Sequence, residues 1–81
     1  MENPDIILLT IPVCPKCTTM KRRLENIVEA HPEITVEERS LLGNIGFARE
    51  KGILTVPAML VRGKPIRGVV SESVILDSLG F

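Results

Sequence analysis

The chain has 81 residues, of which 44% are hydrophobic and 25% charged, a composition typical of one small globular domain rather than a disordered segment. Ten basic residues balance ten acidic ones, so no bulk positive field points to nucleic acid or to a membrane surface. Two phenylalanines are the whole aromatic content, too few for the platforms on which nucleic-acid-binding proteins stack bases. We expect a single, monomeric domain over residues 1–81.

The first half of the chain predicts a strand followed by a long helix. Ile6–Ile11 is a continuous apolar run with β-branched residues, typical of a strand buried on both faces, and Pro12 ends it. From Pro15 onward apolar residues recur every three or four positions, which predicts an amphipathic helix of about four turns. The helix is expected to stop at His31-Pro32, where a cationic histidine suits the helix dipole.

The middle of the chain predicts a short strand and a second helix. Ile34–Val36 is expected to form the strand, and Ser40 is expected to be the N-cap of the helix. Gly52 is expected to end this helix, although Gly43 and Gly46 weaken its helical propensity. The residues expected to face inward are Leu41, Leu42, Ile45 and Ala48.

The last third predicts a hairpin and a final helix. Ala58–Val61 is expected to form one strand and Ile66–Val70 the other, with a tight connection over Gly63, Lys64 and Pro65. Ser71 is expected to cap the last helix. The order β-α-β-α-β-β-α predicts an α/β fold, in which a mixed four-stranded sheet is covered by three helices and the first, most apolar strand is central.

Two cysteines stand in one short motif, Cys14-Pro15-Lys16-Cys17, between the first strand and the long helix. The first turn of a helix offers unpaired N–H groups and the positive end of the dipole. A Cys14 thiolate at this place can accept a hydrogen bond from the Cys17 N–H, and Lys16 adds a positive charge, so all three effects favour the charged form. Cys17, one turn deeper, is expected to be more shielded and able to attack a mixed disulfide on Cys14.

Two thiols at this spacing have other possible uses. A closed zinc or iron–sulfur site needs about four ligands, and the one histidine, His31, lies about 25 Å from Cys14 along a helix. A site that carries copper on two thiolates stays open, although domains of that kind have the element order β-α-β-β-α-β. Two chemically idle cysteines are the third possibility. The dithiol chemistry needs no metal and no prosthetic group. Because the N-terminus lacks the positive start of a secretory signal, we expect a cytoplasmic protein.

Taken together, these residues resemble the thioredoxin superfamily over essentially the whole chain. The match consists of the cysteine motif after a buried strand, Val56-Pro57 later in the chain, and a hairpin followed by Gly68 before the final helix. The resemblance implies that Pro57 is cis and packs beside the disulfide, and that Val56 pairs its backbone with a bound substrate segment. Thr55-Val56-Pro57 is also a form common in glutaredoxins. We therefore expect Thr55, Val56, Pro57 and Gly68 to shape a substrate groove.

Within the superfamily, the chain has the length of a glutaredoxin. Ile11, however, replaces the lysine that usually precedes the first cysteine in glutathione-binding members, and the Gly68 to Ser71 stretch resembles the ending of thioredoxins. The chain is most similar to the short thioredoxins of archaea and anaerobic bacteria. That similarity implies a thiol–disulfide oxidoreductase with protein disulfides as substrates and a thioredoxin-reductase-type electron donor. The alternative is a glutaredoxin coupled to glutathione.

One position departs from long thioredoxins. Leu8 replaces the buried aspartate of the first strand, which is proposed to help deprotonate the second cysteine. Glu37 or Glu38 can take over this role only if the fold brings one of them close to Cys17.

Overall fold

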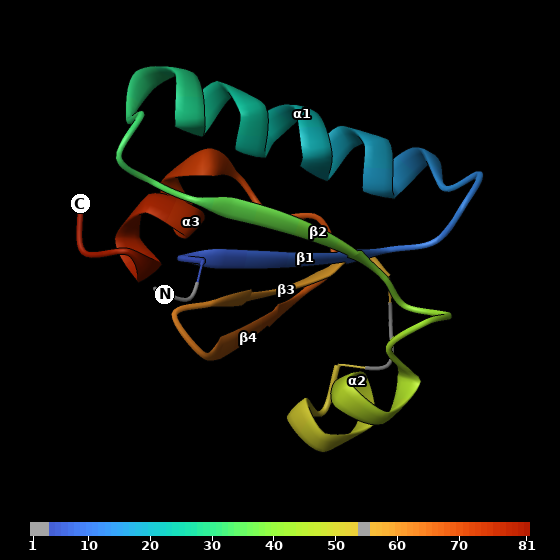
Figure 1. Ribbon diagram of the computed structural model, residues 1–81. Helices are drawn as coiled ribbons and strands as arrows, with labels where there is room; N and C mark the ends of the chain where they lie inside the picture. Colours follow the sequence, from blue (N-terminus) through green and yellow to red (C-terminus); the bar gives the residue numbers. More distant parts are fainter. Residues whose placement is uncertain (1–3, 54–55) are drawn as a thin grey trace.

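The chain folds into the predicted α/β architecture over residues 4–53 and 56–81, the part that this computed structural model describes (Figure 1). In chain order the elements are β1 (Ile6–Thr10), α1 (Pro15–Ala30), β2 (Val36–Ser40), α2 (Ile45–Lys51), β3 (Ala58–Val61), β4 (Lys64–Arg67) and α3 (Glu72–Ser78). The helices α1 and α3 lie on one face of the sheet and α2 lies on the other (Figure 1). No helix within the described ranges is long and apolar enough to cross a bilayer.

The four strands form one mixed sheet in the order β2-β1-β3-β4. β1 is parallel to β2 and antiparallel to β3, and β3 and β4 form an antiparallel hairpin. The most apolar strand is therefore central, as the sequence predicts. Parallel pairing of β1 and β2 requires a long crossover, which α1 supplies. As a result, the end of β1 leads directly into the cysteine motif at the start of α1.

The sheet separates two apolar clusters, because successive residues of a strand point to opposite faces. Ile6 and Leu8 of β1 pack toward α1 and α3, where they meet Met20, Leu24 and Ile75. Leu9 packs on the other face, together with Ala48 of α2 and Ile53. The larger cluster lies between the sheet and α1, so the helix that carries the thiols packs against the core.

The strand expected at Ile34–Val36 is in fact β2, Val36–Ser40. Four of its five residues are polar, so its hydrophobic pattern does not predict a strand. Its sequence Val-Glu-Glu-Arg-Ser suits an edge strand, which pairs on one side only. Ile34 is buried but precedes the strand. The pairing of β2 with β1, rather than local hydrophobicity, sets its boundaries.

Ser40 is not a helix cap; it ends β2 opposite Thr10 of β1. The Leu41 N–H still donates to the Thr10 carbonyl at 2.8 Å, so the chain stays bonded to the sheet past Ser40. α2 consequently begins only at Ile45, after Asn44. Of the four residues expected to face inward, Ala48 is buried and Leu41 is partly buried, whereas Leu42 and Ile45 are exposed. Gly52 ends the helix at φ 72°, as predicted.

The hairpin turn lies earlier than expected. Arg62 and Gly63 form it with φ values of 49° and 86°, and positive φ at both central residues suits the twist of a two-residue hairpin. β4 then runs over Lys64–Arg67 instead of Ile66–Val70. Pro65 is tolerated because β4 is an edge strand, where a missing N–H can face solvent. Ser71 caps α3 as predicted, its Oγ accepting from the Val74 N–H at 3.5 Å.

Candidate active site

The cysteine motif adopts the geometry of a capped helix start. Cys14 is the N-cap of α1, with φ −127° and ψ 103°, and its Sγ accepts a hydrogen bond from the Cys17 N–H at 3.2 Å. Pro15 follows at the first helical position, where its missing N–H leaves no bond unmade. The first helical bond runs from the Thr18 N–H to the Cys14 carbonyl at 3.1 Å. The chain thus places a sulfur where serine or aspartate usually caps a helix.

The two thiols differ in exposure. Both cysteines are free; Cys14 is partly exposed, whereas the Cys17 residue is buried at 4% exposure. Lys16 lies on the exposed side of the first turn. A large partner can therefore reach the Cys14 sulfur first, and the Cys17 sulfur lies beneath it.

The two environments move the thiol pKa values in opposite directions. The pKa of Cys14 lies below its ordinary value, chiefly because the Cys17 thiol donates a hydrogen bond to its sulfur. The N–H groups of Cys17 and Lys16 and the Lys16 charge act in the same direction. The pKa of Cys17 lies above its ordinary value, first because burial removes water from the thiolate and second because its proton is bonded to Cys14. This asymmetry favours Cys14 as the nucleophile.

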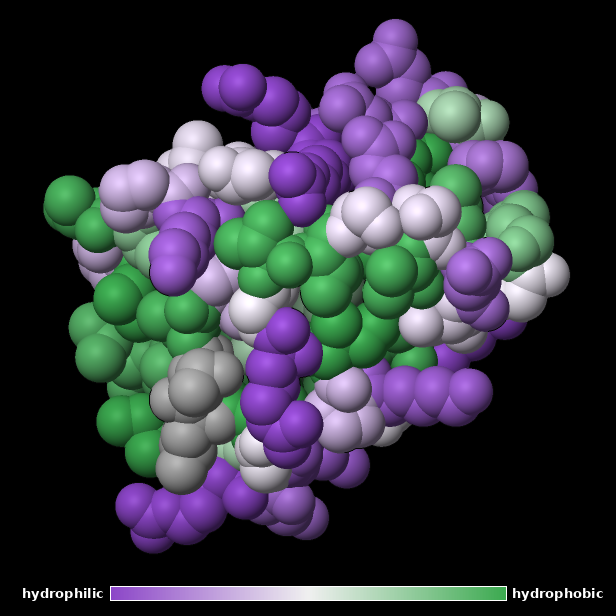
Figure 2. Space-filling model, turned by 180° about the vertical axis from the view of Figure 1, so that it is seen from behind, coloured by the Kyte–Doolittle hydropathy of each residue, from purple (hydrophilic) through white to green (hydrophobic). Residues whose placement is uncertain are grey.

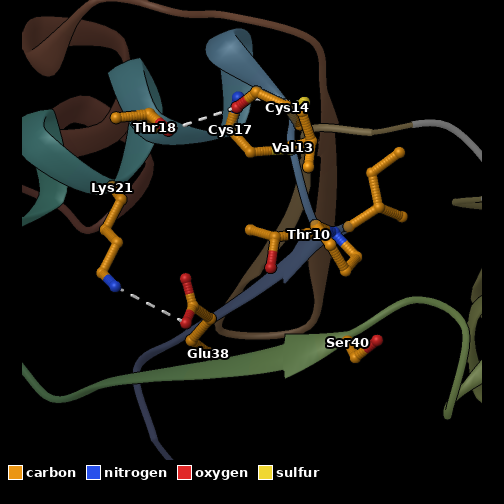
Figure 3. Close-up of a pocket in the computed structure, with 10 residues that line it drawn as sticks. Thr10, Val13, Cys14, Cys17, Thr18, Lys21, Glu38 and Ser40 are labelled. Carbon is orange, nitrogen blue, oxygen red and sulfur yellow. Dashed lines mark hydrogen bonds and ion pairs between the residues drawn. The ribbon is translucent and has the colours of Figure 1, made fainter.

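A pocket of about 400 Å³ opens beside the thiols, between the β1–α1 connection, the first turns of α1 and β2 (Figure 3). Besides the two cysteines, its polar lining is Thr10, Thr18, Lys21, Glu38 and Ser40. Across it the Lys21 ammonium of α1 and the Glu38 carboxylate of β2 approach to 3.7 Å, with the carboxylate turned toward α1 (Figure 3). The pocket therefore places a carboxylate and an ammonium beside a buried thiol.

The described residues expected to form the substrate groove belong to the β3–β4 side of β1, whereas the pocket is lined from the β2 side. The Val56–Pro57 peptide bond is cis, as the resemblance implied, with Pro57 buried and Val56 partly exposed. Gly68 donates its N–H to the Pro57 carbonyl at 2.8 Å, so it joins the end of β4 to this segment. At φ 78° Gly68 has a conformation that favours glycine. Thr55 lies outside the described residues. Of the described groove residues, none lines the pocket beside the thiols.

Several apolar side chains near the thiols and near the start of α3 are exposed. Val13, directly before Cys14, is 99% exposed and has φ 55°, a rare backbone conformation for a β-branched residue. Val69 and Val74 near the start of α3 are also exposed. Figure 2, which shows the molecule from behind, has hydrophobic side chains on its left part, the end that holds the β1–α1 connection, and also across the centre of the view. Such a surface is suited to contact with another protein.

Four polar residues of the pocket were not predicted as site residues from the sequence: Thr10, Thr18, Lys21 and Ser40. Lys21 follows Cys17 by one helical turn, and this spacing was the signal that could have placed it beside the thiols. Thr10 and Ser40 reach the pocket because they are partners in the parallel register. His31 does not join the site; it caps the far end of α1 and packs on Phe81, with ring centroids 4.6 Å apart. Within the described ranges, no three His, Cys, Asp or Glu side chains gather as a metal site.

Comparisons with known proteins agree with this architecture. No family model matches the chain. It is 34% identical to a thioredoxin of Methanocaldococcus jannaschii over 64 residues, which cover 78% of this chain and 75% of that protein. Thioredoxin 1 of Thermosipho africanus superposes with a TM-score of 0.68 at 19% identity, over 93% of this chain and 89% of the other.

Mitochondrial thioredoxin 3 of Saccharomyces cerevisiae gives a TM-score of 0.71 at 15% identity, over 96% of this chain and 79% of the other. These two likenesses concern the fold, and the archaeal relative supports thiol–disulfide oxidoreductase chemistry in general. With its cysteine motif at the end of a central strand and this degree of identity to a thioredoxin, the chain belongs to the thioredoxin superfamily.

Proposed function

We propose that this chain is a thioredoxin-like electron carrier that reduces disulfides in partner proteins with the Cys14–Cys17 dithiol. The observation that carries the proposal is the hydrogen bond from the Cys17 N–H to the Cys14 sulfur at the start of α1. It stabilises a thiolate at Cys14, the more exposed of the two cysteines, and the buried Cys17 thiol lies one helical turn away. No prosthetic group takes part.

The reaction proceeds in two exchanges. The Cys14 thiolate attacks one sulfur of the substrate disulfide, and the other substrate sulfur leaves as a thiolate that takes up a proton. Cys17 then loses its proton and attacks the Cys14 sulfur. The second substrate thiol is released, and a Cys14–Cys17 disulfide remains. Two electrons pass to the substrate, and an external reductant must return them.

Substrate contacts are proposed for the exposed apolar residues and for the cis-proline segment. Val56 is partly exposed beside buried Pro57, so its backbone is available to a substrate strand. Gly68 is bonded to this segment, and among the described residues no atom other than those of Gly68 and its chain neighbours lies within 4 Å of the place where a Cβ would stand. As electron donor we propose a reductase of the thioredoxin-reductase type, in line with the thioredoxin relative.

A redox titration tests the proposal. The protein is equilibrated in thiol–disulfide buffers, and its free thiols are counted by alkylation and mass spectrometry. A reversible two-electron transition at about −270 mV supports a thioredoxin-like carrier. A value of about −200 mV favours coupling to glutathione. If no reversible Cys14–Cys17 disulfide forms at any potential, the dithiol does not carry electrons and copper binding by the same thiols becomes the hypothesis to test.

A further inference from the structure

The second exchange poses a chemical problem at Cys17. Only a thiolate attacks a disulfide, yet burial raises the pKa of the Cys17 thiol. The proton must therefore leave a shielded sulfur, and Cys14 cannot take it, because Cys14 is bound in the mixed disulfide at that moment. A neighbouring acceptor lowers the barrier to such a step.

Among the described residues, the pocket beside Cys17 has one carboxylate in its lining, that of Glu38. From α1 it receives Lys21 and the Thr18 hydroxyl, from the end of β1 the Thr10 hydroxyl, and from β2 Glu38 and Ser40. Besides Cys17, Lys21 and Glu38, the remaining titratable group in the described lining is Cys14. Lysine is protonated near neutral pH and the hydroxyls hold their protons, which leaves Glu38 as the group able to accept one. The volume of about 400 Å³ leaves room for water between Glu38 and the sulfur.

We propose that Glu38 accepts the Cys17 proton through water in this pocket, and that Lys21 is the positioning residue that holds the carboxylate there. The inference rests on the proposed dithiol function and concerns its second exchange. The proton passes from the Cys17 sulfur to the Glu38 carboxylate as Cys17 attacks Cys14. The leaving substrate thiolate, or bulk water, then removes the proton from Glu38, so the group is regenerated in each turnover.

The pleat of β2 gives Glu38 this position and denies it to its neighbour. Glu38 faces α1 and meets Lys21 at 3.7 Å. Glu37 points to the opposite face of the sheet, where Arg39 donates to its carboxylate at 3.0 Å and also lies 5.1 Å from the centre of the Phe47 ring. Two glutamates adjacent in sequence thus differ in their access to the thiols. Glu37→Gln is a matched control for Glu38→Gln, since both remove one negative charge from β2.

A role as proton acceptor can be separated from a role as a nearby charge. The negative charge of Glu38 disfavours a Cys17 thiolate, so its removal lowers the Cys17 pKa whichever role it has. If Glu38 acts only as a charge, Glu38→Gln therefore speeds the second exchange. If it accepts the proton, the same variant slows this exchange although the thiol has become more acidic. The thiolate fraction of Cys17 then rises while the rate of the second exchange falls.

The experiment is a single-turnover reaction of the reduced protein with an aromatic disulfide that releases coloured thionitrobenzoate. The first release reports attack by Cys14 and depends on reagent concentration, whereas the second reports attack by Cys17 and does not. For Glu38→Gln we expect an unchanged first release and a second release slowed by about tenfold near neutral pH. Glu37→Gln should match the unchanged protein in both releases.

The Cys17 pKa is measured separately, by the pH dependence of alkylation in the Cys14→Ser background with and without Glu38→Gln. A second release in Glu38→Gln that is as fast as in the unchanged protein, or faster, overturns the inference and leaves the dithiol function standing. If the unchanged protein shows no second release at all, the proposed function itself fails. Heat denaturation of each variant checks that the fold is retained, and Glu38→Asp, which keeps a carboxylate, should recover part of the rate.

Discussion

Leu8 of β1 and Glu38 of β2 are direct partners in the parallel register, and both lie on the face of the sheet that α1 covers. Leu8 is 1% exposed within the core, whereas Glu38 reaches the edge of the thiol pocket. The carboxylate that long thioredoxins hold at the place of Leu8 is thus absent, and another stands one strand further out. A carboxylate there avoids the cost of burying a charge under the active site, because water and Lys21 both reach it.

The opposite pKa shifts of the two thiols predict unequal reactivity. In the reduced protein at pH 7, we expect Cys14 to be alkylated at least about tenfold faster than Cys17, since a depressed pKa enlarges the thiolate fraction and a raised pKa reduces it. Timed labelling with iodoacetamide, followed by peptide mapping, measures both rates in one sample. Equal rates for the two sites would contradict the described asymmetry.

Substitution of either cysteine should interrupt a different exchange. Cys17→Ser leaves the nucleophile but removes the second attack, so covalent mixed disulfides with protein substrates should accumulate on Cys14. Cys14→Ser should abolish disulfide reduction and form no such complexes. Non-reducing electrophoresis after incubation with an oxidised protein substrate shows both results, and a reducing agent should release the trapped partner. Full disulfide reduction by Cys14→Ser would show that the order of attack proposed here is wrong.

The hydrogen bonds and the ion pair of Asp5 at the N-terminal end of β1 predict acid sensitivity. The Thr35 N–H donates to Asp5 at 3.1 Å, and this bond, followed by the Arg62 guanidinium, holds the pKa of Asp5 below its ordinary value of 3.8. A carboxyl whose pKa is depressed by folding stabilises the fold above its unfolded pKa, and the stabilisation is lost as pH falls through the folded pKa.

We therefore expect Asp5→Asn to lower the free energy of unfolding by roughly 1 kcal/mol at pH 7. The difference from the unchanged protein should shrink below pH ~4 and vanish in stronger acid. Urea denaturation at a series of pH values measures it. A difference that stays constant across this range would mean that the Asp5 charge does not contribute.

The sequence was sufficient for the elements whose own pattern decides their structure. β1 is apolar enough to be recognised as central, and α1 has a clear period, a proline at its start and a stop at His31. The cysteine motif, located by those two elements, was predicted with its hydrogen bond from Cys17 to Cys14. Tertiary pairing decided the rest. β2 is polar, and only its pairing with β1 makes Val36–Ser40 a strand.

The pocket could not be predicted from the sequence, for the same reason. The positions of Glu38 and Ser40 beside the thiols follow from the register of two strands separated by a long helix, and no local signal in the sequence specifies that register. The local sequence pattern instead predicted that Ser40 caps a helix. The sequence did identify both Glu37 and Glu38 as candidates, and the pleat of β2 separates them, since one faces α1 and the other faces Phe47.

Val13 predicts a site where a substitution stabilises the fold. A β-branched residue at φ 55° carries a backbone cost of about 1–2 kcal/mol, and its side chain makes up for little of it at 99% exposure. Glycine removes this cost but loses more entropy on folding, by about 0.5–1 kcal/mol. Val13→Gly should therefore raise the free energy of unfolding by up to about 1 kcal/mol, measured in urea. Pro12 is also exposed but has no positive φ, so Pro12→Ala should not stabilise the fold. A destabilised Val13→Gly would contradict the strain at Val13.

Lys21 offers the complementary test of the charges around Cys17. Its ammonium, 3.7 Å from the Glu38 carboxylate, offsets the negative charge that faces the thiol pocket. Lys21→Met removes that compensation, so the Cys17 pKa should rise above its already raised value, and alkylation of Cys17 at neutral pH should slow by a few fold, about twofold to fivefold for a partly screened pair. The matched control is Arg22→Met, which removes one positive charge from the next, exposed position of α1, outside the pocket lining. Added salt should weaken the effect of Lys21→Met, because salt screens exposed charges. A Cys17 that responds equally to both substitutions would indicate a general effect of net charge rather than the Lys21–Glu38 pair.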